Sequence, residues 1–281
     1  MDTVTLSNGV KMPILGYGVF QINDLEECER VVGEAIEVGY RSIDTAQAYG
    51  NESAVGKAIK KSGVPREEFF VTTKVWITNA GYEKAKASID ESLKLLQTDY
   101  IDLVLIHQPF NDYYGTYRAM EEYYKEGKIK AIGVSNFYPD RFIDIAQFSE
   151  IKPMVNQVET HVFNQQIEPQ NILEKYSTQI QSWAPFAEGK NDFFDNELLK
   201  NIGARYGKSV AQVALRYLIQ RNVVVIPKTV TKERMIQNFD VFDFTLTVEE
   251  MNEILTLDKE KSLFFSHYDP ETVEYLTGLS R

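Results

Sequence analysis

The sequence has one cysteine, no surplus of positive charge and no long apolar run, and each absence excludes a class of protein. Cys28 is the only cysteine in 281 residues, so an intrachain disulfide cannot form, and no cysteine-histidine cluster of the metal-binding type occurs. The formal net charge of −11 argues against a general nucleic-acid surface. No run approaches the roughly eighteen apolar residues that span a bilayer, and residues 1–10 do not resemble a signal peptide. We therefore expect no metal ion, no nucleic-acid partner, no membrane contact and a cytoplasmic location.

Short apolar runs alternate with segments of helical periodicity from residue 15 onward. Apolar side chains recur three or four positions apart in segments 28–36, 54–59, 85–96 and 210–218, as in helices that cover one face of a sheet. The expected strands span 15–20, 41–44, 69–75, 100–107, 130–135, 154–158, 179–183 and 223–226. Residues 103–106 and 223–226 are apolar without alternation, which is typical of parallel strands buried on both sides.

Eight such strands with helices between them favour a (β/α)8 barrel, and an open doubly wound sheet is the alternative. Residues 3–14 precede this repeat, and Asn8 with Gly9 predicts a hairpin with a type I′ turn there. No linker or change in composition interrupts the pattern. The sequence therefore predicts a single barrel domain over residues 1–281.

Titratable residues stand where several of the expected strands end. Asp44, Lys74 and His107 lie at or just past the carboxyl ends of three strands, and Tyr49 follows in the loop after Asp44. In a barrel these ends converge on the face where active sites are built, with neighbouring strands about 4.8 Å apart. Each residue alone has an ordinary explanation, such as a core histidine, a surface ion pair or a loop tyrosine. Four of them at successive strand ends favour a shared pocket.

These four side chains could together donate a proton to a carbonyl oxygen. Tyrosine has a reference pKa of about 10, and a neighbouring ammonium lowers that pKa because it favours the phenolate. We therefore expect Tyr49 to be the general acid, Lys74 to tune it, and Asp44 to compensate the buried charge of Lys74. His107 could donate to the substrate oxygen and orient the carbonyl.

Two other kinds of function stay open. A lysine at the end of a barrel strand is also where Schiff-base aldolases place their nucleophile, although a carboxylate at Asp44 would keep Lys74 protonated. The scaffold could also bind a cofactor and act as a redox sensor on a partner. A pure sensor does not need a proton donor, which counts against that alternative.

The usual motifs for nucleotide binding are absent. Residues 16–18 read Gly-Tyr-Gly without the third glycine of the G-x-G-x-x-G fingerprint, and no Walker-type phosphate loop occurs. Barrels hold phosphates with the loops after the seventh and eighth strands and a helix N-terminus. Residues 227–231 open such a helix, so Lys228, Thr229 and Arg234 are candidates for binding a ribose 2′-phosphate. A plain capped helix with two solvated cations would have the same pattern.

Further side chains at strand ends could hold a nicotinamide group. Ser135, Asn136 and Gln157 end the fifth and sixth expected strands, where a hydroxyl and two amides could orient the carboxamide. Trp183 ends the seventh strand and could stack on the ring, or could be a core tryptophan.

Motifs in order along the chain resemble the signatures of the aldo-keto reductases. They are residues 39–46 (GYRSIDTA) with 49–52 (YGNE), 132–137 (IGVSNF), and 226–229 (IPKT) with Arg234 and Asn238. The resemblance covers the whole chain, from the hairpin through residues 266–270. It implies a (β/α)8 barrel and the reduction of aldehydes or ketones with hydride from NADPH.

By position, the resemblance implies Tyr49 as proton donor, Lys74 and Asp44 as its tuning partners, and His107 as the residue that orients the substrate. The cofactor-binding residues that it implies are Gly18, Val19, Phe20, Asp44, Ser135, Asn136, Gln157, Trp183, Ala184, Pro185, Phe186, Ile226, Pro227, Lys228, Thr229, Val230, Arg234, Gln237 and Asn238. Similar sequences often have serine, glycine and an acidic residue where this chain has Ala184, Ala187 and Gln237.

The substrate is a small carbonyl compound in this interpretation. Its expected contacts are Phe20, Tyr49, Trp76, His107 and Phe110, of which the three apolar residues would form a wall. Residues 261–281 resemble the family's C-terminal loop, which folds over the barrel mouth. Relatives of this style include bacterial 2,5-diketo-gluconate reductases, glyoxal reductases and prostaglandin F synthase-like enzymes, which implies small aldehydes, α-dicarbonyls or keto-sugars as substrates. We expect the chain to be a monomer.

Overall fold

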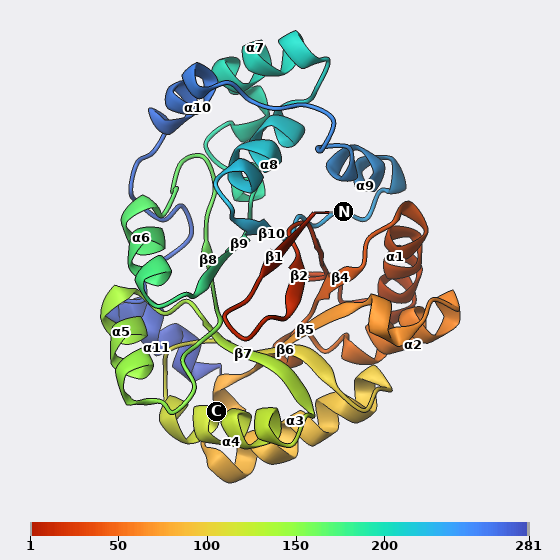
Figure 1. The fold of residues 1–281 in the computed structure, drawn as a ribbon, viewed down its shortest axis with the longest axis vertical. Coiled ribbons are helices and arrows are strands. Elements are labelled where there is room, and N and C mark those ends of the chain that lie inside the picture. Colours follow the sequence, from red (N-terminus) through yellow and green to blue (C-terminus); the bar gives the residue numbers. More distant parts are fainter. Residues whose placement is uncertain (1, 280–281) are drawn as a thin grey trace.

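Eight parallel strands form the central sheet of the computed structural model, which describes residues 2–279 (Figure 1). The strands of this sheet are β3 (Tyr17–Gly18), β4 (Ser42–Asp44), β5 (Phe70–Val75), β6 (Ile101–Ile106), β7 (Ile129–Ser135), β8 (Val155–Glu159), β9 (Gln179–Trp183) and β10 (Val224–Val225). The helices are α1 (Leu25–Val38), α2 (Glu52–Ser62), α3 (Tyr82–Leu96), α4 (Tyr113–Lys125), α5 (Pro139–Phe148), α6 (Ile167–Lys175), α7 (Glu197–Tyr206), α8 (Val210–Gln220), α9 (Lys232–Phe239), α10 (Val248–Leu255) and α11 (Pro270–Gly278). The strands coincide with the eight expected segments, although the first and last are shorter.

The sheet curls until its two edge strands meet. The strands pair in chain order from β3 to β10. Between the edges, Gly16 N–H donates to the carbonyl of Val225 (2.8 Å), and Val225 N–H donates to that of Ile14 (2.9 Å). Gly18 N–H then donates to the carbonyl of Pro227 at 3.2 Å. These bonds form the closing seam of the barrel, so the (β/α)8 barrel is confirmed and the open doubly wound sheet is wrong.

A hairpin of β1 (Thr3–Thr5) and β2 (Lys11–Pro13) covers the end of the barrel where the strands begin. The chain passes from β2 into β3, and Asn8 Nδ2 donates to the carbonyl of Lys130, early in β7, at 2.9 Å. The hairpin is confirmed, but the type I′ turn is wrong, because of its two central residues only Gly9 has a positive φ (87°). A glycine in this conformation after an ordinary turn also matches the twist of a hairpin.

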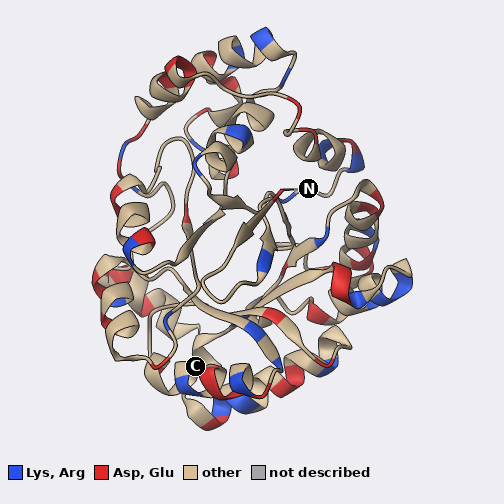
Figure 2. Cartoon of the chain, in the orientation of Figure 1, with Lys and Arg blue, Asp and Glu red and all other residues tan. Residues whose placement is uncertain are grey.

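The connections between barrel strands carry helices that surround the sheet (Figure 1). Their buried apolar side chains belong to the same core as those of the strands. In α1 the buried side chains run along one face from Cys28 to Ile36. The Asp24 side chain caps its start by accepting from Glu27 N–H, and Gly39, with a φ of 122°, ends it. Charged residues of both signs lie mainly on the outer helices, as Figure 2 shows.

The segment after α10 returns over the carboxyl ends of the barrel strands. Ser262 Oγ donates to the Glu159 carboxylate at the end of β8, and the His267 ring bonds Gln108, which follows β6 closely. This placement agrees with the C-terminal loop expected over the barrel mouth. Within residues 2–279, none of the helices is long and apolar enough to cross a membrane.

Candidate active site

Four titratable side chains meet at the carboxyl ends of β4, β5 and β6. Asp44 is the last residue of β4, and Lys74 lies one residue before the end of β5. Tyr49 ends a short 3₁₀ helix after β4, and His107 follows β6 directly. Because β4 pairs with β5 and β5 with β6, the structure brings together all four residues that were expected to share a pocket.

Lys74 lies at the centre of this group and is fully buried. Its Nζ donates to Asp44 Oδ1 (2.5 Å), to the backbone carbonyl of Thr45 (3.0 Å) and to Tyr49 Oη (3.2 Å). An ammonium has three protons to donate, so all its hydrogen bonds are made inside the protein. Lys74 therefore presents its charge to the Tyr49 hydroxyl in one fixed geometry.

Burial and charge act in opposite directions on the pKa values of this group. Burial raises the pKa of Tyr49 above its usual 10, and the Lys74 ammonium lowers that pKa only part of the way back. Burial lowers the pKa of Lys74, but Asp44 and Tyr49 together raise it by more, so the pKa of Lys74 lies above its usual value. Burial, followed by Lys74, lowers the pKa of His107 well below 6.5. At neutral pH the tyrosine is therefore protonated, the lysine charged and the imidazole neutral.

His107 packs between the proton-donor candidate and an aromatic wall. Its ring lies edge-on to those of Tyr49 (centroids 5.6 Å apart) and Trp76 (4.9 Å). His107 Nδ1 is buried and has no hydrogen-bond partner within residues 2–279. A proton on Nε2 leaves only a lone pair at that buried position, so the neutral ring can donate from Nε2.

The aromatic side chains expected to form a wall surround this group. The Phe20 ring lies 5.0 Å from that of Tyr49, and 49% of Phe20 is exposed. Phe110 lies farther along the rim, where its ring is 5.6 Å from that of His267 in the C-terminal segment. The burial of His267 lowers its pKa to about 4, so this second imidazole is also neutral at pH 7.

Gln157, on β8, connects the group to the opposite side of the barrel. Its Nε2 donates to Asp44 Oδ2 (2.8 Å) and to Gln181 Oε1 (3.0 Å). Both amide protons are thus used within the protein, and among the described residues Gln157 Oε1 has no hydrogen-bond partner. This fixed orientation leaves a carbonyl-type acceptor available beside the buried Asp44.

Ser135, Asn136 and Trp183 form a second polar group beside Gln157. Ser135 Oγ donates to the Gln157 carbonyl (2.9 Å), and Asn136 Nδ2 donates to Ser135 Oγ (3.2 Å). The half-buried Trp183 donates from its indole to Asn136 Oδ1 at 2.9 Å. The indole therefore has a fixed orientation at the mouth.

The loop after β9 contains backbone conformations that favour glycine. Ala184, Ala187 and Glu188 have φ values of 49°, 50° and 50°. Pro185 is buried, and the half-buried Phe186 has its ring 5.8 Å from that of Phe193. The chain thus keeps left-handed turns here without glycine at positions 184 and 187.

The segment after β10 presents cations near the start of α9. The structure buries Ile226, Pro227, Thr229 and Asn238, and it exposes Lys228, Val230, Arg234 and Gln237. Within residues 2–279, neither Lys228 nor Arg234 has an ion pair or a side-chain hydrogen bond. Thr231 stands at the N-cap, but its side chain makes no capping bond, so the first N–H groups of α9 stay available. A basic, donor-rich corner results.

Gly18 and Val19 lie between this corner and Asp44. A Cβ on Gly18 would be 3.1 Å from the carbonyl oxygen of Ile226, and Val19 N–H donates to the carbonyl of Asp44 at 3.1 Å. Glycine at position 18 therefore permits the first strand to approach the segment after β10 closely.

Several residues of this mouth were missed by the sequence analysis. Gln181 orients Gln157, and Glu159 binds Ser262 and His161. The signal for Glu159 was present, because residues two apart on a strand face the same side and Gln157 was already a candidate. Ser262 carried no such signal, since only the tertiary fold brings it to β8. Within the described residues, no group of three or more His, Cys, Asp or Glu side chains could hold a metal ion.

Known proteins resemble this chain in both sequence and fold. The model of the "Aldo/keto reductase family" matches residues 14–259. The glyoxal reductase of Bacillus subtilis (strain 168) is 48% identical over 261 residues, which cover 92% of this chain and 94% of that protein. An aldo-keto reductase from a Medee basin deep-sea metagenome library has a TM-score of 0.92 and 46% identity, covering 95% of this chain and 98% of that one. An aldo-keto reductase of Bombyx mori in complex with NADP has a TM-score of 0.88 and 34% identity, covering 92% and 94%. The chain therefore belongs to the aldo/keto reductase family.

Proposed function

We propose that this protein reduces small aldehydes or ketones to alcohols with NADPH, and that Tyr49 donates the proton. The observation that carries the proposal is the position of Lys74 Nζ, 2.5 Å from Asp44 Oδ1 and 3.2 Å from Tyr49 Oη. A charged lysine held against a protonated tyrosine is suited to general acid catalysis at a carbonyl.

The residues at the mouth fit a nicotinamide dinucleotide phosphate. Gln157 Oε1 is a free acceptor for the carboxamide, and Trp183 offers a half-buried indole face for the ring. Lys228 and Arg234 are exposed cations beside the start of α9, where a 2′-phosphate would meet charge and N–H donors together. The NADP complex of the Bombyx mori relative supports the same assignment.

Each of the four central residues has a separate role in the proposed reaction. When bound, NADPH supplies a hydride for the carbonyl carbon. His107 donates from Nε2 to the carbonyl oxygen and orients it. Tyr49 then gives its hydroxyl proton to that oxygen, and the Lys74 ammonium stabilises the negative charge left on Tyr49. Asp44 keeps Lys74 protonated throughout, which its raised pKa supports.

The aromatic rim favours compact substrates. Phe20, Trp76 and Phe110 leave a mouth lined by rings, and the C-terminal segment packs over it through His267. The similarity to a glyoxal reductase supports α-dicarbonyls as the first class to test. Keto-sugars such as 2,5-diketo-gluconate are the second class. The expected single domain, monomeric state and cytoplasmic location remain predictions of the same proposal.

A Schiff-base mechanism is disfavoured by the same geometry. Its lysine must lose a proton, whereas Asp44 and the Thr45 carbonyl both accept from Lys74 Nζ. Borohydride treatment with a carbonyl compound and no cofactor should therefore leave Lys74 unmodified. Mass spectrometry of the tryptic peptides provides the readout.

The test of the proposed function is cofactor oxidation. The purified protein is mixed with NADPH and glyoxal, methylglyoxal, simple aldehydes or 2,5-diketo-gluconate, and absorbance at the nicotinamide band is followed. We expect turnover that Tyr49→Phe lowers about 10²–10⁴-fold, while NADPH binding, followed by fluorescence, persists. NADPH binding without turnover of any carbonyl would instead favour the sensor alternative.

A further inference from the structure

A buried carboxylate lies at the barrel mouth outside the proposed catalytic group. Glu159 ends β8 and is 6% exposed. It stands two residues after Gln157, so both side chains face the same side of the strand. Within residues 2–279 no lysine or arginine pairs with it. Because an isolated buried charge is costly, the partners that compensate Glu159 indicate what it is for.

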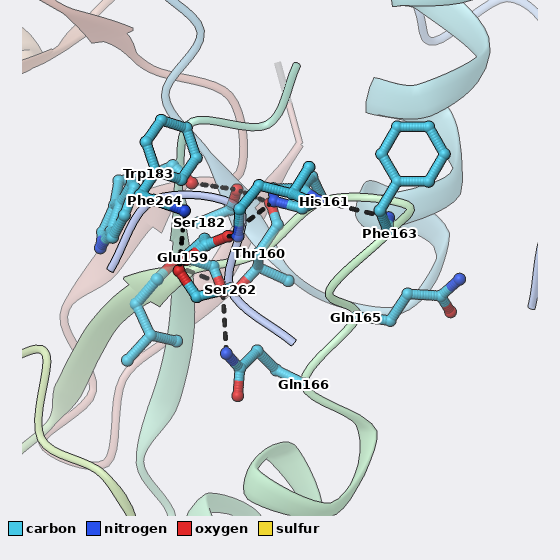
Figure 3. Close-up of polar contacts among 12 residues, drawn as sticks. Glu159, Thr160, His161, Phe163, Gln165, Gln166, Ser182, Trp183, Ser262 and Phe264 are labelled. Carbon is cyan, nitrogen blue, oxygen red and sulfur yellow. Dashed lines mark hydrogen bonds and ion pairs between the residues drawn. The ribbon is translucent and has the colours of Figure 1, made fainter. Parts of the chain in front are cut away.

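The C-terminal segment supplies two of these partners (Figure 3). Ser262 Oγ donates to Glu159 Oε2 (2.5 Å), and Leu263 N–H donates to Oε1 (2.9 Å). Ser262 Oγ in turn accepts from the N–H groups of Phe264 and Phe265, both at 3.0 Å. The carboxylate therefore fixes the backbone of a tight turn, residues 262–265, which we call the anchored turn.

His161 supplies the third partner from the loop after β8. Its Nδ1 accepts from Phe163 N–H (3.2 Å), so the ring proton of the neutral form is on Nε2, which lies 2.8 Å from Glu159 Oε1. The carbonyl of Phe163 accepts from Lys259 N–H at 2.9 Å. The loop after β8 thus holds the chain just before the anchored turn and also orients the carboxylate.

The anchored turn carries two aromatic rings onto Trp183. The ring of Phe264 meets the indole edge-on at 5.2 Å, and that of Phe265 lies nearly parallel to it at 6.1 Å. The indole is also bonded to Asn136. A continuous set of contacts therefore leads from Glu159 through the anchored turn to Trp183, the proposed neighbour of the nicotinamide.

We propose that Glu159 is a positioning residue for the carbonyl reaction: it anchors residues 262–265, and these in turn hold Trp183 in its orientation at the mouth. This inference rests on the proposed function for its kinetic consequences, but not for its structural ones. A carboxylate is required because all three partners donate. A carboxamide of the same size would present an N–H group, and not an acceptor, to one of these three donors.

Two variants break the same link from opposite sides. In Glu159→Gln, Oε1 can still accept from His161 and Leu263, but the amide nitrogen then faces Ser262 Oγ, whose proton loses its acceptor. Ser262→Ala removes the hydroxyl and leaves Glu159 intact. The matched control is Glu250→Gln on α10, another buried carboxylate with three donors, from Arg205, Tyr206 and Thr247, away from the mouth.

The first measurement is limited trypsin cleavage after Lys261, which is exposed and directly precedes the anchored turn. Losing a hydrogen bond to a charged group corresponds to a roughly tenfold or larger rise in the fraction of molecules whose anchored turn is detached from Glu159. The rate of cleavage follows that fraction. We expect this rise in Glu159→Gln and Ser262→Ala, no further rise in the double variant, and none in Glu250→Gln. Equal cleavage in all variants would overturn the anchor.

The second measurement asks whether the anchor positions Trp183. The chain has two tryptophans, so a Trp76→Phe background leaves Trp183 as the only one. We expect the two link-breaking variants to shift its emission to the red and to increase its quenching by acrylamide. Cleavage that rises while emission and KM stay unchanged would make Glu159 merely structural and overturn the positioning role.

The third measurement separates this inference from the proposed function. With Trp76 intact, we expect KM for the best carbonyl to rise roughly three- to tenfold in both link-breaking variants, while kcat stays within about threefold. A kcat loss without a change in KM would contradict this. If none of the carbonyl compounds causes the unaltered protein to oxidise NADPH, the proposed function fails. The cleavage and emission measurements still decide whether Glu159 anchors residues 262–265.

Discussion

Replacing Lys74 by methionine removes the charge on which the proposed chemistry depends and keeps most of the side-chain volume. The variant loses the bonds from Nζ to Asp44, Thr45 and Tyr49. Tyr49 is half-buried and loses the ammonium that lowers its pKa, so its proton becomes harder to give up. General acid catalysis contributes about 10²–10⁴-fold, and we expect kcat to fall by that factor.

Stability changes too, because among residues 2–279 Asp44 keeps Gln157 as its only side-chain donor. Removing one member of a buried pair costs about 3–5 kcal/mol, which for a chain of this size lowers Tm by ~6–20 °C. The double variant Lys74→Met/Asp44→Asn removes the stranded charge as well. We expect it to recover part of the Tm while kcat stays low.

The assay combines stopped-flow NADPH oxidation, calorimetry and NADPH binding by fluorescence at a temperature where all variants are folded. NADPH affinity should change little in Lys74→Met, since Lys74 contacts none of the proposed phosphate-binding residues. Tyr49→Phe should lose a similar factor in kcat with little loss of Tm, because the Asp44–Lys74 pair survives. A Lys74→Met protein that is folded and keeps kcat within tenfold of the unaltered protein would refute the reasoning.

Four further predictions concern the surroundings of this group and the loop after β9. Arg234→Ala should weaken NADPH binding about tenfold and leave NADH binding nearly unchanged, as titrated by fluorescence, because it removes a cation proposed to face the 2′-phosphate. The buried, neutral ring of His107 should show no imidazole titration in NMR spectra between pH 8 and 5.5, since its pKa is lowered well below 6.5. His267 has a pKa of about 4 in the folded state and about 6.5 when unfolded, so its contribution makes stability fall as pH drops from 6.5 towards 4. His267→Gln should flatten that fall in Tm; an equal slope would contradict it. Glu188→Gly should raise stability by about 1 kcal/mol by relieving a φ of 50°, whereas Glu253→Gly inside α10 should lower it by a similar amount in denaturant titrations.

The barrel could be predicted from the sequence because each element had a local signal. Apolar runs without alternation located the strands, and periodic stripes located the helices between them. The group around Lys74 could also be predicted from the sequence, since every member stands at a strand end or in the next loop. The turn type at Asn8 was wrong because a two-residue Asn-Gly turn and a longer turn ending in Gly9 share the same sequence signal.

What the sequence could not supply was any relation between distant segments. Ser262 lies 103 positions from Glu159, and no periodicity connects them. The raised pKa of Tyr49 could not be predicted from the sequence either, because it depends on how completely the fold removes water from the hydroxyl. Charge neighbours can be anticipated from strand order, but desolvation can only be read from three-dimensional packing.

The closing seam of the barrel has a consequence for how the protein responds to its cofactor. The seam consists of the short strands β3 and β10, and the backbone bonds of Gly16, Gly18 and Val225 hold it closed. The proposed cofactor contacts at Gly18 and Lys228 lie on opposite sides of it. A dinucleotide bound across both sides acts as a clasp, and the amide of Gly18 should then exchange its hydrogen more slowly. In that arrangement the lifetime of the closed barrel depends on the concentration of the dinucleotide around it.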